Sequence, residues 1–331
     1  MTDRNALIRS FLTETKWANA QRKLLAGDAS NRRYERLTDT GSAKTVVLMD
    51  APPNIGESTR PFLRIAQHLH RIGFSSPEIL ARDIDAGLLL IEDLGDDLFA
   101  RIIPCQPDLE PTLYTAATDV LLALHQMPVP ELVALNAMEM AELTSLAFSS
   151  YRAGIIGNTG GEPRFRTMFR SVLEGIAPEK PVLVLRDYHA ENLLWLPDRS
   201  GVARVGLLDF QDAMSGHPAY DLVSLLQDAR RDVPKTIEEA MIKHYVDRSG
   251  FDLHAFQTAY AVLGAQRNLR ILGVFARLSL EHGKPHYVDL IPRVWAHLQR
   301  DLQHPALVDI AQFLQDALPE PTTENLQRLK P

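Results

Sequence analysis

The chain has 331 residues, a length that favours one large domain or two modest ones. Hydrophobic residues make up 45% of it and charged residues 23%, which is the balance of a globular protein with a sizeable core. The 35 lysines and arginines are outnumbered by 42 acidic residues, and the net charge is −7. A general nucleic-acid-binding role is therefore disfavoured, because it needs a strongly basic face.

A single cysteine, Cys105, excludes a disulfide within the chain and favours a reducing compartment. No histidine lies near it in sequence, so we interpret it as a packing or loop residue and not as a nucleophile. Residues 1–17 contain scattered charges, unlike a signal peptide, and no apolar run reaches the roughly 20 residues that cross a bilayer. We expect a cytoplasmic monomer without nucleic-acid or membrane partners.

The pattern up to residue 91 predicts a small lobe rich in strands. Strands are predicted at 34–37, 45–49, 79–81 and 88–91, where β-branched and apolar residues gather between turn residues. The sequence Asp39-Thr40-Gly41-Ser42 is typical of a turn and makes the first two strands a hairpin. Helical spacing of apolar residues predicts an opening helix over 5–17 and a second helix over 59–72, which ends at Gly73.

Beyond Gly95 the pattern becomes mainly helical, with helices predicted at 110–126, 137–153 and about 254–281. Residues 182–209 are the exception. They predict a strand at 182–185 and a hairpin with strands 192–196 and 202–208. The order of elements predicts an α+β fold of two lobes, residues 1–94 and 95–331, with a cleft at the connector from Glu92 to Asp97.

The most informative polar residues flank the predicted hairpin. The open ends of an antiparallel hairpin lie side by side, so Asn192 and Asp209 are predicted neighbours, and Asp187 lies in the loop just before them. Two carboxylates and an amide are hard oxygen ligands that suit Mg²⁺ better than Zn²⁺. Each residue alone is typical of turns. Their combination and spacing favour phosphoryl transfer, which depends on positioning and charge neutralisation.

These motifs resemble the catalytic loop and the metal-binding motif of the protein-kinase-like fold, in the branch of aminoglycoside phosphotransferases and choline kinases. The branch has His-Gly before its catalytic aspartate, whereas this chain has Leu185-Arg186; Gln211 fits the branch. The resemblance implies ATP as phosphoryl donor and Asp187 as the base. It also implies Asn192 and Asp209 as catalytic residues that hold Mg²⁺.

Further motifs are similar to the anomeric N-acetylmuramate/N-acetylglucosamine kinases of bacterial cell-wall recycling. They are Gly27–Tyr34, Met49–Pro53, Ile91–Gly95 and Ala265–Leu269. The resemblance implies an ATP-dependent kinase for the anomeric hydroxyl of an N-acetylated amino sugar. In the segment His217 to Leu222 it implies that Asp221 supports the catalytic loop and is not a catalyst.

The resemblance places the nucleotide in the N-terminal lobe. The residues expected to bind it are Gly27, Asp28, Ser30, Arg32, Arg33, Met49, Glu92 and Leu94. Met49 occupies the strand position where a kinase has the lysine that holds the phosphates, and Lys44 only precedes that strand. Either an arginine such as Arg32 or Arg33 replaces the lysine, or nucleotide binding is weakened. The backbone carbonyl of Glu92 and the N–H of Leu94 are expected to pair with adenine.

The sugar site is predicted from arginines of the long helix near 254–281. Arg267, Arg270 and Arg277 recur on roughly one face of it. Such a stripe is ordinarily solvated, but the helix is strongly apolar, so the arginines are candidates to line a cavity. A guanidinium would bind the lactyl carboxylate of N-acetylmuramate bidentately. Tyr151, with Arg152 beside it, is a further substrate candidate.

Three alternatives remain open from the residues alone. An aminoglycoside acceptor would favour an acidic pocket, and choline would need an aromatic cage. The missing strand lysine also allows a nucleotide sensor that binds ATP without turnover.

His189 lies within the catalytic loop and is interpreted as a residue that braces it, and no histidine has the spacing of a zinc site.

Overall fold

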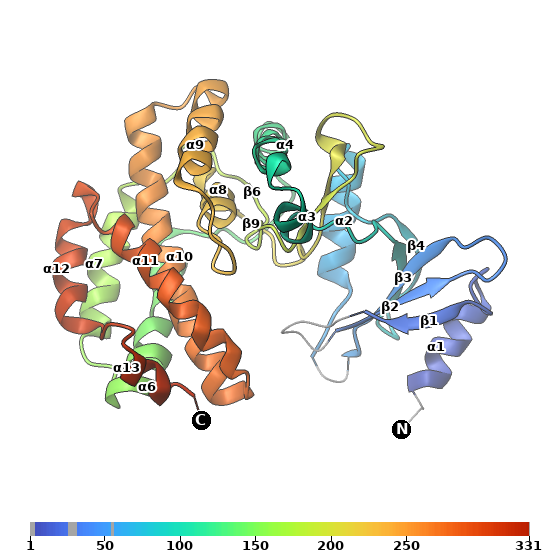
Figure 1. The fold of residues 1–331 in the computed structure, drawn as a ribbon, viewed down its shortest axis with the longest axis horizontal. Coiled ribbons are helices and arrows are strands. Elements are labelled where there is room, and N and C mark those ends of the chain that lie inside the picture. Colours follow the sequence, from blue (N-terminus) through green and yellow to red (C-terminus); the bar gives the residue numbers. More distant parts are fainter. Residues whose placement is uncertain (1–3, 26–31, 54–55, 331) are drawn as a thin grey trace. The chain divides into compact units, whose positions relative to one another are not determined.

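The computed structural model describes residues 4–25, 32–53 and 56–330 (Figure 1). The chain forms two compact units. Unit 1 contains Met1–Ala117 and Ala190–Ala213, and unit 2 contains Thr118–His189 and Met214–Pro331. This division differs from the predicted boundary between residues 94 and 95. Unit 1 extends further along the chain and takes in a later segment that contains the predicted hairpin.

Unit 1 is built on an antiparallel five-stranded sheet with the order β1-β2-β3-β5-β4. Its strands are β1 (Gln21–Leu24), β2 (Arg33–Thr38), β3 (Thr45–Asp50), β4 (Ile79–Asp83) and β5 (Leu88–Glu92). The four strands predicted from sequence are present. The edge strand β1 was not predicted, because its sequence Gln-Arg-Lys-Leu has no apolar alternation and all four residues are exposed.

Helix α1 (Arg4–Thr13) packs its apolar residues on one face of this sheet. Ile8, Phe11 and Leu12 form a core with alternate strand residues, among them Val46 and Leu48. Because neighbouring residues of a strand face opposite sides, Val47 and Met49 point away from α1. At the end of β3, Asp50 returns to the α1 side. The Arg4 Nε donates to its Oδ1 over 2.9 Å.

Two further segments complete unit 1. Helix α2 (Arg60–Arg71) buries Phe62, Ile65 and Leu69, as its spacing predicts. The hairpin of β7 (Leu193–Trp195) and β8 (Val205–Leu207) joins the unit through backbone bonds. The N–H of Leu207 donates to the carbonyl of Ser75 over 2.8 Å, and that of Trp195 donates to Asp97 over 2.8 Å. These bonds explain why residues 190–213 belong to unit 1. Helix α3 (Phe99–Cys105) and the 3₁₀ turns at Pro107–Leu109 and Gly201–Arg204 also lie here.

Unit 2 is mainly helical, and the chain enters it within α4 (Glu110–Leu124). The other helices are α5 (Ala137–Thr144), α6 (Ala153–Ile156), α7 (Glu162–Glu174), α8 (Ala219–Leu226), α9 (Lys235–Ser249), α10 (Leu253–His282), α11 (Ile291–Asp301), α12 (Val308–Ala317) and α13 (Thr323–Arg328). A two-stranded ribbon joins β6 (Val182–Val184) to β9 (Met214–Gly216), and 3₁₀ turns occupy Pro285–Leu290 and Pro305–Leu307. The predicted α+β class is confirmed.

Helix α10 is the central element of unit 2. Its 30 residues pack against α5, α8 and α11, and most of them are buried. The helix predicted over 137–153 is interrupted by a π-helical turn at Ala147–Arg152. α10 comes so close there that a Cβ on Gly273 would lie 2.2 Å from the carbonyl carbon of Leu146. Among the described residues, no helix is both long and apolar enough to cross a membrane.

Candidate active site

In unit 1, the hairpin brings two predicted metal ligands together. Leu193 pairs with Leu207, and the N–H of Leu208 donates to the carbonyl of Asn192 over 3.0 Å. Asp209 is therefore the residue that follows the backbone partner of Asn192. The neighbour relation expected from an antiparallel hairpin is present.

The backbone of Asp209 and the ring after it fix this carboxylate. Asp209 has a φ of 56°, in the left-handed region that non-glycine residues seldom adopt. Its Oδ1 accepts a 2.6 Å hydrogen bond from the amide of Gln211. The next residue, Phe210, is fully buried and stacks on Phe62 of α2, with ring centroids 4.9 Å apart. A strained conformation held by packing is typical of a functional residue.

In unit 2, Asp221 of α8 holds the backbone just before Asp187. Its fully buried carboxylate accepts from the N–H of Leu185 over 2.6 Å and from that of Arg186 over 2.9 Å. The Ser224 hydroxyl, one turn along α8, donates to the Arg186 carbonyl over 3.1 Å. Three side-chain bonds from one helix thus fix the residues that lead to Asp187. The predicted supporting role of Asp221 agrees with this geometry.

Arg186 has a φ of 74°, which is again left-handed. This is the position where the resembling branch has glycine, and glycine alone adopts such a φ without cost. An arginine here costs roughly 1–2 kcal/mol of backbone strain. The bonds from Asp221 and Ser224 to its backbone hold the conformation in place.

The surroundings of Asp187 favour its charged form. Burial opposes ionisation, but Arg267, Arg270, His189 and Arg186 together hold the pKa of Asp187 below its ordinary value. The carboxylate is therefore ionised at neutral pH and able to accept a proton or a hydroxyl hydrogen bond.

His189, two residues after Asp187, is uncharged at neutral pH. Burial lowers the pKa of His189 to about 4, so the ring is neutral at physiological pH. Arg230 approaches its Nε2 to 3.3 Å. This contact agrees with the interpretation of His189 as a residue that braces the loop.

Three consecutive residues of α10 bind three different partners. Gln266 donates to the Met140 carbonyl over 2.8 Å, Arg267 to the Ser224 hydroxyl over 2.6 Å, and Asn268 to the Gln227 side chain over 2.8 Å. Successive helical residues point in directions about 100° apart, so one short motif ties α10 to several elements. The motif at Ala265–Leu269 is thus explained by packing of the helical unit.

The predicted substrate residues differ in accessibility. Arg267 is 5% exposed and lies behind Ser224, whereas Arg270 is only partly buried. Tyr151 is fully buried, and its hydroxyl donates to the Pro319 carbonyl over 2.8 Å. Arg152 donates to the carbonyl of Ala317. Sugar contacts by Arg270, Arg267 and Tyr151 all stay predictions. The side chains of Arg267 and Tyr151 have hydrogen-bond partners within the protein.

The residues predicted to bind the nucleotide differ in whether the structure describes them and in how deeply they are buried. Gly27, Asp28 and Ser30 lie outside the described residues. Met49 is fully buried between Tyr34 of β2 and Leu89 of β5. Lys44, before β3, is exposed and does not occupy the position of the missing lysine.

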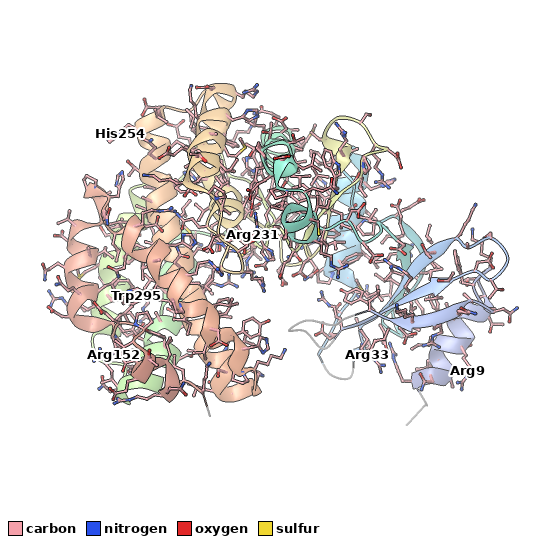
Figure 2. The ribbon with its side chains drawn as sticks, in the orientation of Figure 1. Arg9, Arg33, Arg152, Arg231, His254 and Trp295 are labelled. Atoms are coloured by element: carbon pink, nitrogen blue, oxygen red, sulfur yellow. The ribbon has the colours of Figure 1, made fainter. Side chains whose placement is uncertain are left out.

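Arg32 and Arg33, the two arginines proposed to replace the lysine, differ in burial and in their partners. Arg33 is exposed on β2 (Figure 2). Arg32, one residue earlier, is 12% exposed in its side chain, and its Nε lies 2.9 Å from the Oε2 of Glu57. Glu57 carried no sequence signal, because it stands alone in a turn with no periodic pattern.

The predicted adenine segment lies at the end of β5. Arg199, from the β7–β8 turn, donates to the Oε1 of Glu92 over 2.5 Å and to the Ser75 hydroxyl over 2.7 Å. A Cβ on Gly206 would lie 3.1 Å from the side chain of Leu94, so β8 packs closely under this segment. The predicted hinge residues and the hairpin are thereby held in one unit.

Asn192 and Asp209 would supply two oxygen ligands, a donor set that fits Mg²⁺. This ion is usually held by one or two protein carboxylates, with waters and substrate phosphates completing the octahedron. Within the described part of the chain, no group of three or more His, Cys, Asp or Glu side chains is placed to hold a metal ion.

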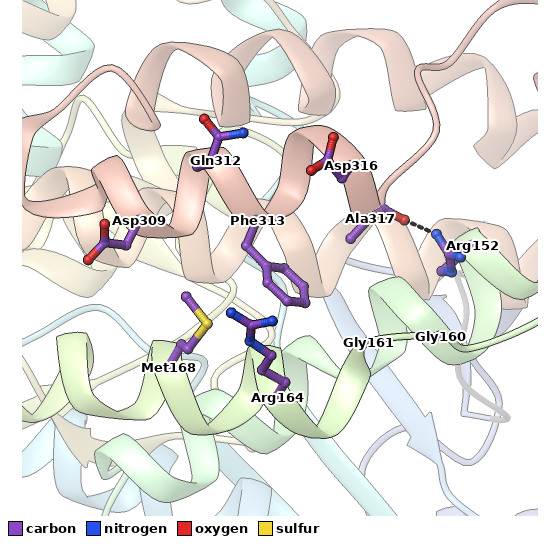
Figure 3. A pocket seen from close by; sticks show the side chains of 10 residues that line it. All are labelled: Arg152, Gly160, Gly161, Arg164, Met168, Asp309, Gln312, Phe313, Asp316 and Ala317. Carbon is purple, nitrogen blue, oxygen red and sulfur yellow. Dashed lines mark hydrogen bonds between the residues drawn. The ribbon is translucent and has the colours of Figure 1, made fainter.

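A cavity of about 610 Å³ lies elsewhere in unit 2, between α7 and α12 (Figure 3). Its lining includes Arg164, which lies 5.7 Å from the ring centroid of Phe313, and Arg152, bonded to Ala317. None of the residues predicted for catalysis or nucleotide binding lines it. We do not assign it to the active site.

Comparison with known proteins gives a consistent set of relatives. A model of the phosphotransferase enzyme family matches residues 21–263. An N-acetylmuramate/N-acetylglucosamine kinase of Caulobacter vibrioides is 38% identical, over 97% of this chain and 98% of the relative. One of Pseudomonas putida is 30% identical, over 87% of this chain and 86% of the relative.

Among solved structures, an ethanolamine kinase of Plasmodium vivax is similar with a TM-score of 0.63. It is 14% identical in sequence, and the match covers 92% of this chain and 86% of that one. At such low identity the likeness concerns the fold alone.

Proposed function

The chain belongs to the phosphotransferase enzyme family, and from this premise we propose that it phosphorylates an amino sugar. It transfers the γ-phosphoryl group of ATP to the anomeric hydroxyl of N-acetylmuramate or N-acetylglucosamine, a step of cell-wall recycling. The observation that supports this most is the 38% identity, along nearly the whole of both chains, to a relative that bears this name.

In this reaction the protein acts mainly by positioning and by charge. Asp187, held ionised by the surrounding arginines, orients the sugar hydroxyl and accepts its proton. An anomeric hydroxyl is more acidic than an ordinary alcohol, so a carboxylate of low pKa is a sufficient base. Asn192 and Asp209 would hold Mg²⁺, which neutralises charge on the phosphates of bound ATP.

Arg270 is the arginine we propose for the acceptor. It is partly buried on α10, and its charge acts on Asp187, so it lies in the electrostatic neighbourhood of the base. A guanidinium at this point suits the lactyl carboxylate of N-acetylmuramate. N-Acetylglucosamine lacks that carboxylate, so replacement of Arg270 by Met is expected to impair N-acetylmuramate more strongly.

The test is to identify the product. The purified protein is incubated with ATP, Mg²⁺ and each sugar, and ³¹P NMR of the product is recorded. Coupling of the phosphomonoester to the anomeric proton supports the proposal. Coupling to the C6 methylene protons, or turnover of amino alcohols or aminoglycosides alone, contradicts it, and ATP binding without any turnover favours the sensor alternative.

Two variants test whether formation of this product depends on Asp187. Asp187→Asn keeps the shape but removes the base, and is expected to lower the rate about 100- to 10,000-fold. The matched control is Asp198→Asn, the same change at an exposed turn residue of the hairpin, which should leave the rate unchanged. An Asp187→Asn variant of full activity would refute the role of the base.

A further inference from the structure

An ion pair joins the start of β2 to the segment before α2. The Nε of Arg32 lies 2.9 Å from the Oε2 of Glu57, and their side chains are 12% and 15% exposed. Two charges so largely removed from water are costly to bury, and the cost is offset only with good geometry and additional polar partners. This pair therefore differs from the exposed ion pairs of the surface helices.

The pair belongs to a polar cluster on the sheet face that points away from α1. Burial raises the pKa of Tyr34 to about 12; Arg32 opposes the rise, through its charge and a hydrogen bond, while Asp209 and Glu57 add to it. Tyr34, two residues from Arg32, is paired across the sheet with Met49. Through Tyr34 the cluster thus adjoins Met49, the strand position where the lysine is missing.

Packing independently brings the Asp209 segment to the start of α2, the helix that follows Glu57. Phe210 stacks on Phe62, which lies in the first turn of α2, five residues beyond Glu57. Asp209, the proposed Mg²⁺ ligand, is thereby held near the end of α2 where the ion pair sits. Arg32 is the cation that pairs with Glu57 there.

We propose that Arg32 binds the phosphates of the nucleotide and that Glu57 positions its guanidinium. This inference rests on the proposed use of ATP. A guanidinium has five donors, so it can bind a carboxylate and a phosphate at the same time. Arg33 is excluded from the role, because neighbouring strand residues face opposite sides of the sheet and its side chain is exposed.

Binding of ATP and of adenosine to the full-length protein, measured by calorimetry with Mg²⁺, tests the proposal. Arg32→Met is expected to weaken ATP binding about 10- to 100-fold, the equivalent of one or two charge-assisted hydrogen bonds. Adenosine, which has no phosphates, should bind the variant as it binds the wild type. Arg33→Met, which removes the same charge one residue away, is the matched control and should bind both ligands normally.

Two more variants separate a phosphate contact from a structural pair. Arg32→Lys keeps the charge without the planar fork, so its ATP affinity should lie between those of the wild type and Arg32→Met. Glu57→Gln should also weaken ATP binding, and adding it to Arg32→Met should cause no further loss, because the positioned group is already gone.

The proposal is overturned if Arg32→Met binds ATP as the wild type does, if ATP and adenosine lose affinity equally, or if Arg33→Met shows the larger loss. A wild-type protein that binds ATP but phosphorylates no sugar contradicts the proposed function alone, since the phosphate contact is still measured. A wild type without ATP binding overturns both.

Discussion

The hydrogen bonds from the backbone of Leu185 and Arg186 to Asp221, here called the Asp221 brace, offer the most direct test of how unit 2 positions the base. The Asp221 carboxylate accepts two backbone N–H groups, over 2.6 and 2.9 Å, and is fully buried. In Asp221→Asn, one oxygen becomes an NH₂ group that cannot accept, so one buried N–H loses its partner. Such a group costs about 1–3 kcal/mol. Urea unfolding followed by circular dichroism should show a loss of this size.

The same change should impair catalysis, because the two bonds fix the residues that lead directly to Asp187. A displacement of about 1 Å at a reacting group can cost roughly 100-fold in rate. The matched control is Asp232→Asn, which breaks an exposed ion pair to Arg293 and should cost less than about 1 kcal/mol with no loss of rate. Equal stability and rate in Asp221→Asn and its control would refute the role of the brace.

The pH dependence of stability provides a second readout. Burial raises the pKa of Asp221 to about 7, although its two backbone hydrogen bonds oppose the rise. A carboxyl whose pKa is higher in the folded than in the unfolded chain contributes stability at acid pH that is lost as the pH rises through about 7. Asparagine does not titrate. The stability difference between wild type and Asp221→Asn should therefore narrow between pH 4 and pH 8.

Three further outcomes follow from the site. Arg186→Gly should raise the free energy of unfolding by about 1 kcal/mol in urea titration, since glycine adopts a φ of 74° without strain; no gain would contradict the strain. Arg267→Met should shift the acid limb of the kcat/KM profile to higher pH, because the positive charge of Arg267 no longer counteracts the effect of burial on the pKa of Asp187. Arg277→Met should leave the acid limb where it is. Asp209→Ala should raise the Mg²⁺ concentration for half-maximal rate more than about tenfold, and an unchanged requirement would exclude it as a ligand.

The local pattern of apolar and β-branched residues was sufficient to predict strands β2 to β5 and the central helix α10. β-branched runs between turn residues predicted β2 to β5, and apolar periodicity placed the long helix within one residue of the observed Leu253–His282. Apolar alternation did not predict β1, an exposed edge strand that pairs with β2 through backbone bonds and through the ion pair of Arg22 with Glu35. The local pattern also ran through Ala147–Arg152, where α10 approaches and the helix is interrupted.

The pairing of Asn192 with the Asp209 segment was also predictable, because a short hairpin leaves few possible registers. The sequence motif likewise indicated the supporting role of Asp221. Neither prediction required knowledge of how distant elements pack, since each involves residues within one continuous segment or a recurrent motif.

The sequence by itself determined the α+β class, the family and the order of the catalytic residues, because these follow from periodicity and from motifs of fixed spacing. Only the tertiary structure decided which of two adjacent arginines is paired, since the choice depends on which side of β2 meets Glu57, 25 residues away. It also decided that Arg267 turns toward Ser224, 43 residues away. Periodicity indicates that a side chain is buried, but the partner that compensates its charge is chosen by the packing of elements far apart in the chain.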